Sequence, residues 1–592
     1  MQTSEQPKKA NNPLAKFEGF FIQMVMPGLE AKCGEIVAQS LGSNWQIKPI
    51  GDNNTEFEIT LNDDALSAKQ AWDKSYELRS QPGIIDAEPL FTVPITQNQN
   101  WDEQLKPQLQ QSENQANQVS EDAENPDWSL KQLRVFETWQ RFFPDANKLP
   151  GDGIIIGHPD TGYTPHPEII NNLLTAEGFD FLKNDNDPTD ELQKSGGEVI
   201  NNPGHGTSTA SVIVSPQSKQ ANYSNGKYVT GVAPGAKIIP LRVTYSVVLL
   251  SIRNLAEAIE YAADNGVHIL TISLGAGFPN QRLRTAIIYA QKRGVIIVAA
   301  SGTSVPYVVY PAAYDEVIAV TGSTVERKIW WGATTGKQVD VVAPGASVWY
   351  AKTRKQENSD EFEYSIESGE GTSFSAPFVA GVAALWLSYH GRDNLIERYG
   401  VEKIPFIFNQ LLRDSCDKFP TWKPNKHGTG IVNAEKLLDA PLPDSVNRSI
   451  IAPGMALQQY SSVDRGEINT FTHLFESQLS TTESANNFLF RDDGKLSASL
   501  CQILQVSEAE LPQRLKEVGQ ELAFYLTTNP ELYQEFADSL HSQESALKPP
   551  STQFKTIENN SLSKTNSMRG MLLKQGISEV LKNKIENKLP EN

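Results

Sequence analysis

Three residues of this chain occur in surroundings that suit acyl transfer at a peptide bond. Asp160 ends an apolar run and precedes Thr161-Gly162, which predicts a carboxylate at the carboxyl end of a buried strand. His205 lies between glycines ahead of an apolar run, which suits an exposed imidazole on the first turn of a helix. Ser373 precedes a helix-forming run that is apolar on nearly all sides, so free backbone N–H groups and the helix dipole should favour negative charge there. An acid, a base and a nucleophile are the groups that this chemistry needs.

Each residue alone also has an ordinary structural explanation. Asp-Thr-Gly is common in turns, a histidine between glycines is often a loop residue, and a serine before an apolar helix is often an N-cap. Pro377 is expected in the first turn of the helix after Ser373, where a missing N–H is tolerated. The interpretation of the three residues as one catalytic triad rests on their order along the chain, Asp, His, Ser. Subtilisin has its triad in the same order.

The elements that must position these residues are short apolar strands alternating with helices. Between 127 and 438 the strands read as buried on both faces, as in a parallel sheet, and the helices end at Gly266 and Gly294. The pattern predicts an α/β doubly wound architecture. The expected strands are 153–158, 237–243, 267–274, 294–301 and 317–322, and the expected helices are 251–266 and 280–294.

Several segments in this region resemble the motifs of one protease family, the subtilases. DTGYTPHPE resembles the aspartate motif, GHGTSTAS the histidine motif and GTSFSAPFVAG the serine motif. GVAPGAKIIPLRV, YPAAYDEVIAV, VVAPG and GTGIVNA resemble further landmarks in the same order. The resemblance covers about half of the chain, 127–438, and implies a subtilisin-like fold and a serine endopeptidase that acts on protein or peptide substrates.

The same resemblance implies roles for the residues around the triad. Ser273, Leu274 and Gly275 would form an edge on which the substrate backbone pairs as an added strand. The substrate-binding set expected from the resemblance is Ser273, Leu274, Gly275, Ser301 and Gly302.

Two positions depart from the family pattern. Where subtilases have an asparagine that donates to the oxyanion, an ungapped alignment places Thr303, whose hydroxyl reaches about one bond less far. Loss of this donor in subtilisin itself lowers turnover by about 100- to 1,000-fold, so an oxyanion hole of Thr303 and the Ser373 N–H predicts a slower enzyme. His158, two residues before Asp160, replaces an apolar residue of the family and is either structural or a modifier of the Asp160 environment.

The N-terminal region predicts a second, smaller domain. Residues 17–95 show the order strand-helix-strand-strand-helix-strand of a ferredoxin-like α+β fold. By the family resemblance this is a propeptide-like inhibitory domain; a permanently attached regulatory domain is the alternative. Residues 96–126 are rich in Gln, Asn, Asp and Glu and predict a linker.

The C-terminal region, 439–592, resembles no family and predicts a mostly helical, partly disordered part of unknown role. Its helical patterns cover 496–506 and 510–541, whereas 544–566 has a Ser/Asn/Pro-rich composition typical of disorder. This region is a candidate for binding a protein partner.

No cofactor is required by this chemistry, although calcium is possible. Calcium takes six to eight oxygen ligands, and Asp185, Asp187 and Asp190, with Asp180 and Glu191 nearby, could supply some of them. A solvated acidic loop explains the same residues equally well.

Composition and charge narrow the class of protein. Hydrophobic residues make up 39% and charged residues 21% of the 592 residues, as in ordinary globular domains. A net charge of -19 argues against nucleic acid and anionic membranes as partners. Three widely spaced cysteines and an N-terminal stretch without a signal-peptide pattern favour a cytoplasmic location, with export by another route left open.

The resulting hypothesis is a serine endopeptidase with the triad Asp160, His205 and Ser373, restrained by its N-terminal domain. The alternative is a pseudoprotease that uses its cleft as a peptide-binding scaffold, which the altered Thr303 position motivates.

Overall fold

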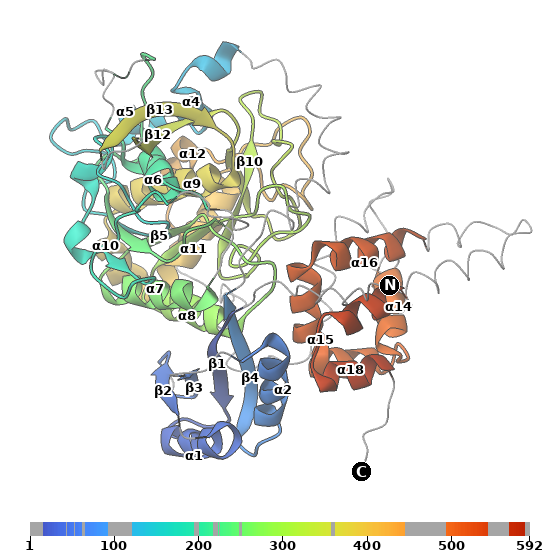
Figure 1. Ribbon diagram of the computed structural model, residues 1–592. Helices are drawn as coiled ribbons and strands as arrows, with labels where there is room; N and C mark the ends of the chain where they lie inside the picture. Colours follow the sequence, from blue (N-terminus) through green and yellow to red (C-terminus); the bar gives the residue numbers. More distant parts are fainter. Residues whose placement is uncertain are drawn as a thin grey trace, which may run out of the picture. The chain divides into compact units, whose positions relative to one another are not determined.

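The computed structural model (Figure 1) consists of two compact units, one of which is assembled from both ends of the chain. Unit 1 comprises residues 1–99 and 462–592, and unit 2 comprises residues 100–461. The structure describes residues 16–92, 121–444, 493–542 and 567–586, apart from 43, 53, 62–65, 194–200, 217–222, 224, 248–250 and 357–360. Most of the expected linker and the expected disordered stretch 544–566 lie outside these residues.

The N-terminal part of unit 1 has the predicted ferredoxin-like order. Its antiparallel sheet runs β2-β3-β1-β4, which places the first and third strands in the centre. Helix α2 begins with a capping box in which Ser67 and Gln70 satisfy each other's backbone N–H groups. The elements are β1 (Lys16–Met24), α1 (Glu30–Leu41), β2 (Trp45–Ile50), β3 (Glu56–Leu61), α2 (Ala68–Arg79) and β4 (Ile84–Thr92).

The C-terminal part of unit 1 is helical, as predicted. The pattern over 510–541 is divided at Asn529-Pro530, because proline fits the first position of a new helix better than the interior of an old one. The labelled helices are α14 (Asp493–Leu504), α15 (Leu511–Thr528), α16 (Pro530–Ser542) and α18 (Glu579–Glu586). Their packing against the N-terminal part was not predicted from the sequence.

Unit 2 contains a seven-stranded parallel sheet with helices on both faces, as the apolar strand runs predicted. The strand order is β11-β10-β9-β8-β5-β7-β6. Alternate strand residues divide between two cores: Ile296 and Val298 pack with α9 and α6, whereas Ile297 and Ala299 pack with α7 and α8. The strands are β5 (Ile155–Asp160), β6 (Phe179–Asp180), β7 (Lys237–Arg242), β8 (Ile269–Ile272), β9 (Ile296–Ala300), β10 (Ile318–Ser323) and β11 (Val341–Pro344).

Helix α9 lies in the first of these cores, together with α6, and its residues are almost all buried. A separate hairpin of β12 (Val348–Lys355) and β13 (Phe362–Gly369) lies outside the predicted pattern. The helices are α4 (Trp128–Gln132), α5 (Val135–Phe142), α6 (His205–Val214), α7 (Ile252–Asp264), α8 (Gln281–Lys292), α9 (Thr372–His390), α10 (Arg392–Tyr399), α11 (Ile404–Asp414) and α12 (Ala434–Asp439), with short 3₁₀ turns at Glu121–Glu124, Ile170–Asn172, Thr175–Glu177 and Val401–Lys403. Over the described ranges, no helix is both long and apolar enough to cross a bilayer.

Candidate active site

The carboxylate of Asp160 lies at the end of β5 and is fully buried. Its Oδ1 accepts a hydrogen bond from the Thr161 N–H at 2.7 Å and lies 2.8 Å from His205 Nδ1, while its Oδ2 lies 3.1 Å from the same nitrogen. Burial alone would raise the pKa of Asp160, but the adjacent His205, its hydrogen bond, His158 and the Thr161 N–H together bring this pKa below its ordinary value. Asp160 is therefore ionised and holds the His205 ring through Nδ1.

His205 is the first residue of α6, as predicted, and two glycines allow its loop to meet the Asp160 loop. A Cβ on Gly206 would lie 2.1 Å from the Gly162 carbonyl oxygen, and Gly162 itself has φ +100°. No other residue type fits this contact without displacing one of the two backbones.

Asp190 joins the same two loops by hydrogen bonds. Its Oδ2 accepts from the Thr161 hydroxyl and from the Gly204 N–H, each at 2.8 Å. The Thr161 hydroxyl in turn accepts from the Gly206 N–H at 3.2 Å. Asp190 thus connects the residue after Asp160 to the residues on either side of His205, a role that the sequence analysis missed because it considered Asp190 only as a metal ligand.

The other aspartates proposed for calcium accept hydrogen bonds or form an ion pair within the chain. Asp185 accepts from the Asp187 N–H at 2.9 Å, and Asp187 accepts from Thr189. Asp180 is paired with the buried Arg242 at 2.8 Å. Within the part of the chain that the structure describes, no group of three or more His, Cys, Asp or Glu residues is arranged to hold a metal ion. Calcium binding by Asp185, Asp187 and Asp190 stays a prediction.

Ser373 is the second residue of α9, so it stands at the end where backbone N–H groups have no helical acceptor. Pro377 is the sixth residue of this helix rather than part of its first turn, which corrects the prediction. Because Pro377 has no N–H, it cannot bond to the carbonyl four residues earlier, which belongs to Ser373. The Ser273 hydroxyl donates a hydrogen bond to that carbonyl instead, at 2.8 Å.

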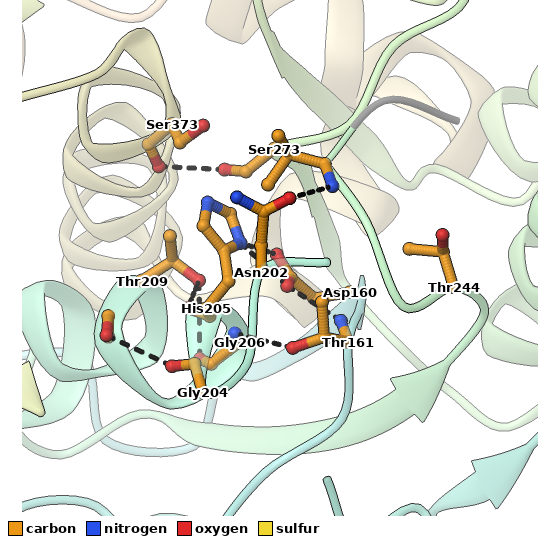
Figure 2. A network of polar contacts seen from close by, with 12 residues as sticks. Asp160, Thr161, Asn202, Gly204, His205, Gly206, Thr209, Thr244, Ser273 and Ser373 are labelled. Carbon is orange, nitrogen blue, oxygen red and sulfur yellow. Dashed lines mark hydrogen bonds and ion pairs between the residues drawn. The ribbon is translucent and has the colours of Figure 1, made fainter. Parts of the chain in front are cut away.

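Figure 2 shows the His205 imidazole between Asp160 and Ser373, with Ser273 beside Ser373. The three residues come from the ends of β5, α6 and α9, which lie far apart in the sequence. The structure therefore places Asp160, His205 and Ser373 in one region, with a direct contact between Asp160 and His205; their catalytic roles stay a prediction.

Thr303 is exposed and contacts Thr372, the residue before Ser373. Its Oγ1 accepts from the Thr372 N–H at 3.2 Å and lies 3.2 Å from the Thr372 hydroxyl, a contact in which either oxygen can be the donor. A threonine hydroxyl thus lies next to the start of α9, where the family resemblance implies an amide donor; its role toward an oxyanion stays a prediction.

The predicted substrate-binding residues occupy two neighbouring strand ends. Leu274 and Ser301 are buried, and the Gly302 N–H donates to the Thr372 hydroxyl at 3.3 Å. The Gly275 N–H donates to the Val247 carbonyl at 3.2 Å. A substrate strand that pairs at Gly275 must therefore displace Val247.

Asn202 and His158 are two further polar residues at the site. Asn202, which the sequence analysis did not single out, accepts from the Val247 N–H at 3.0 Å through its side chain and from the His205 N–H through its backbone. His158 is buried, with Nε2 3.0 Å from the Thr209 hydroxyl and 3.7 Å from Asp160 Oδ2. Burial lowers the pKa of His158, although the Asp160 charge opposes this, so His158 is neutral near pH 7.

Comparisons with known proteins agree with this geometry. Residues 151–404 match the model of the Subtilase family. The chain is 31% identical to subtilisin Savinase of Lederbergia lenta over 290 residues, which cover 48% of this chain and 91% of that one. It is 33% identical to a thermophilic serine proteinase of Bacillus sp. (strain AK1) over 247 residues, 41% of this chain, and so spans about half (54%) of that relative.

A solved structure supports the fold alone. Fervidolysin from Fervidobacterium pennivorans, a keratinolytic enzyme related to subtilisin, superposes with a TM-score of 0.52 at 23% identity, over 72% of this chain and 61% of that one. The family match, the sequence relatives, and the parallel sheet with Asp160 at the end of β5 beside His205 agree on one family. This chain belongs to the subtilase family of subtilisin-like serine endopeptidases.

Proposed function

We propose that the chain hydrolyses peptide bonds in protein or peptide substrates through Ser373, His205 and Asp160, without a required cofactor. The observation that supports these roles is the 2.8 Å contact between His205 Nδ1 and Asp160 Oδ1 at the N-terminal end of α6. It keeps a proton on Nδ1 and leaves Nε2 as the base.

The proposed reaction begins when Ser373 Oγ attacks the scissile carbonyl carbon and His205 Nε2 takes the hydroxyl proton. The ionised Asp160 stabilises the imidazolium that forms, and His205 then gives the proton to the leaving amine. The Ser373 N–H and the Thr303 hydroxyl donate to the oxyanion in the transition state. Water then attacks the carbonyl carbon of the acyl-enzyme while His205 Nε2 takes its proton. The proton passes to Ser373 Oγ as the acid product leaves.

We further propose that the ferredoxin-like domain acts as a propeptide-like inhibitor of this site. The evidence is its position before the catalytic domain and its fold, together with the family resemblance of 17–95.

A fluorophosphonate probe tests the assignment of the nucleophile. After removal of the N-terminal domain, the wild-type protein should be labelled, and Ser373→Ala should not. Ser375→Ala is the matched control, since Ser375 lies on the same helix with its hydroxyl bonded to the Pro344 carbonyl. An unlabelled wild-type protein, or labelling that persists in Ser373→Ala, would contradict the proposal.

A further inference from the structure

The C-terminal helices pack directly on the ferredoxin-like domain, although about 400 residues separate them in the chain. Phe524 of α15 packs between two aromatic rings of the N-terminal part, with ring centroids 4.8 Å from Phe91 and 6.0 Å from Trp72. All three side chains are at least 96% buried. Such a cluster contributes through burial of apolar surface, which is the dominant favourable term in association.

Polar contacts surround this aromatic cluster. The Tyr76 hydroxyl donates to Glu521 at 2.9 Å, and Glu521 also accepts from the Ser578 N–H and hydroxyl at 2.7 and 2.6 Å. Gln520 bridges two residues of the N-terminal part, accepting from Arg79 and donating to Glu88. The Tyr76 and Gln520 hydrogen bonds therefore form only when the two segments are together, whereas the Ser578 bonds lie within the C-terminal part.

A third group of contacts joins α2 to the start of α18. The Asp73 carboxylate accepts from the Glu579 N–H at 2.8 Å, and Lys69 pairs with the Glu579 side chain at 3.0 Å. The exposed ion pair adds little free energy, but together with the Asp73 hydrogen bond it orients the two segments around the buried aromatic cluster.

The chain order gives this interface a consequence. Unit 2 lies in the sequence between the two segments of unit 1, so the C-terminal helices are covalently attached to the catalytic unit independently of the linker. A cut between 95 and 127 breaks only one of the two connections between the units.

We propose that the C-terminal helices are a non-covalent anchor for the N-terminal domain, which remains bound to the protease after the linker is cut. The partner of this helical surface is the chain's own N-terminal domain. Because the anchor keeps that domain at high effective concentration near the catalytic unit, cutting the linker does not by itself relieve inhibition. This last consequence rests on the proposed inhibitory function; retention of the fragment does not.

The anchor is tested in the full chain carrying Ser373→Ala, with a recognition sequence for a site-specific protease inserted after Lys106. After the cut, size-exclusion chromatography and native mass spectrometry should show the N-terminal fragment bound to the rest of the chain. Adding Phe524→Ala and Gln520→Ala should release it about 100-fold faster, the effect of losing a buried aromatic side chain. Gln513→Ala with Lys516→Ala is the matched control, because both residues are exposed on the same helix.

Hydrogen exchange of the cut Ser373→Ala protein, without the substitutions at Phe524 and Gln520, gives a second measurement that does not depend on how those variants fold. Peptides from α2 and α15 should retain the protection that they have before the cut. A fragment that separates at once, or one that stays bound equally tightly when Phe524 and Gln520 are replaced in a protein of unchanged helicity, would overturn the anchor. Because Ser373→Ala is inactive by design, failure of the protease assignment would leave this result unaffected.

Discussion

At the scale of single residues, the site departs from the expected family pattern in two groups near the predicted triad, Thr303 and His158. Asp160 and His205 have the geometry of a working acid and base, and their contact follows from a strand end meeting a helix start. The oxyanion side is different, because the Thr303 hydroxyl also accepts from the Thr372 N–H. Differences in rate should therefore arise at Thr303 rather than at the triad.

Replacing Thr303 by asparagine should raise turnover. A carboxamide reaches further and restores a strong donor, so kcat should rise about 10- to 100-fold, part of the range lost when such a donor is removed. The measurement is steady-state kinetics on a peptide substrate with the N-terminal domain removed. Ser304→Asn, at the next residue, is the control and should leave kcat unchanged. A decrease in kcat for Thr303→Asn would contradict the assigned oxyanion role.

At the scale of elements, the site depends on two loops that must lie against each other. The close approach of Gly206 to Gly162 brings β5 and α6 together, and Asp190 connects them through Thr161 and Gly204. Asp190 therefore acts as a positioning residue with no direct contact to the reacting atoms.

Asp190→Ala should lower kcat by about 100-fold with little change in KM, because a shift of about 1 Å in the His205 loop costs this much. It should also destabilise the catalytic unit by about 2–4 kcal/mol, since the Thr161 hydroxyl and the Gly204 N–H lose their acceptor. Asp187→Ala, in the same loop, should change neither quantity. Steady-state kinetics measures kcat and KM, and chemical denaturation measures the free energy of unfolding. A loss of stability without a loss of kcat would contradict the positioning role.

The contact between helices and the ferredoxin-like domain also contains a pH-sensitive group. Burial raises the pKa of Glu521 to about 7, against the donors Ser578 and Tyr76 and with the help of the Asp73 charge. The folded state then holds a proton that the unfolded state releases at lower pH. The contribution of the protonated Glu521 carboxyl to the free energy of unfolding is fully present below about pH 4.5. It is lost as the pH rises through about 7.

The free energy of unfolding of unit 1 should therefore decrease by about 3 kcal/mol between pH 4.5 and 7 from this group. Glu521→Gln should remove this part of the pH dependence. Glu517→Gln is the control on the same helix. Although partial burial of Glu517 opposes the shift, its ion pair with Lys584 lowers the pKa of this carboxyl below its ordinary value. Thermal unfolding followed by circular dichroism at several pH values makes the comparison, and an unchanged slope in Glu521→Gln would contradict the assignment.

At the scale of the whole molecule, the protease is enclosed in the sequence between two segments that fold together. After one cut, a propeptide-like domain joined only through the linker would be held solely by its contacts with the catalytic unit. The C-terminal helices change this expectation, because they supply a second attachment.

Mass spectrometry of the purified wild-type chain should detect a cut between residues 95 and 127, and Ser373→Ala should remain intact. The reason is that processing by the chain's own site needs the nucleophile. If both proteins are cut equally, an outside protease is responsible and the linker carries no information on specificity. An intact wild-type chain that still hydrolyses peptides would show that the N-terminal domain is a permanent regulatory part.

Much of this protein was determined by its sequence alone. Strong motifs around Asp160, His205 and Ser373 identified the chemistry, and apolar strand runs identified the parallel sheet, since both signals are local in the chain. The ferredoxin-like order was likewise readable from alternating strand and helix patterns.

Only the tertiary structure decided which residues lie around the predicted triad and where the C-terminal region packs. Asp190 connects two loops by hydrogen bonds because the fold places it between them. The Ser273 hydroxyl donates to the Ser373 carbonyl because Pro377 leaves that carbonyl without its helical donor. The packing of Phe524 against Phe91 joins residues from opposite ends of the chain. Such contacts depend on how surfaces meet in space, and no local pattern of residue types specifies them.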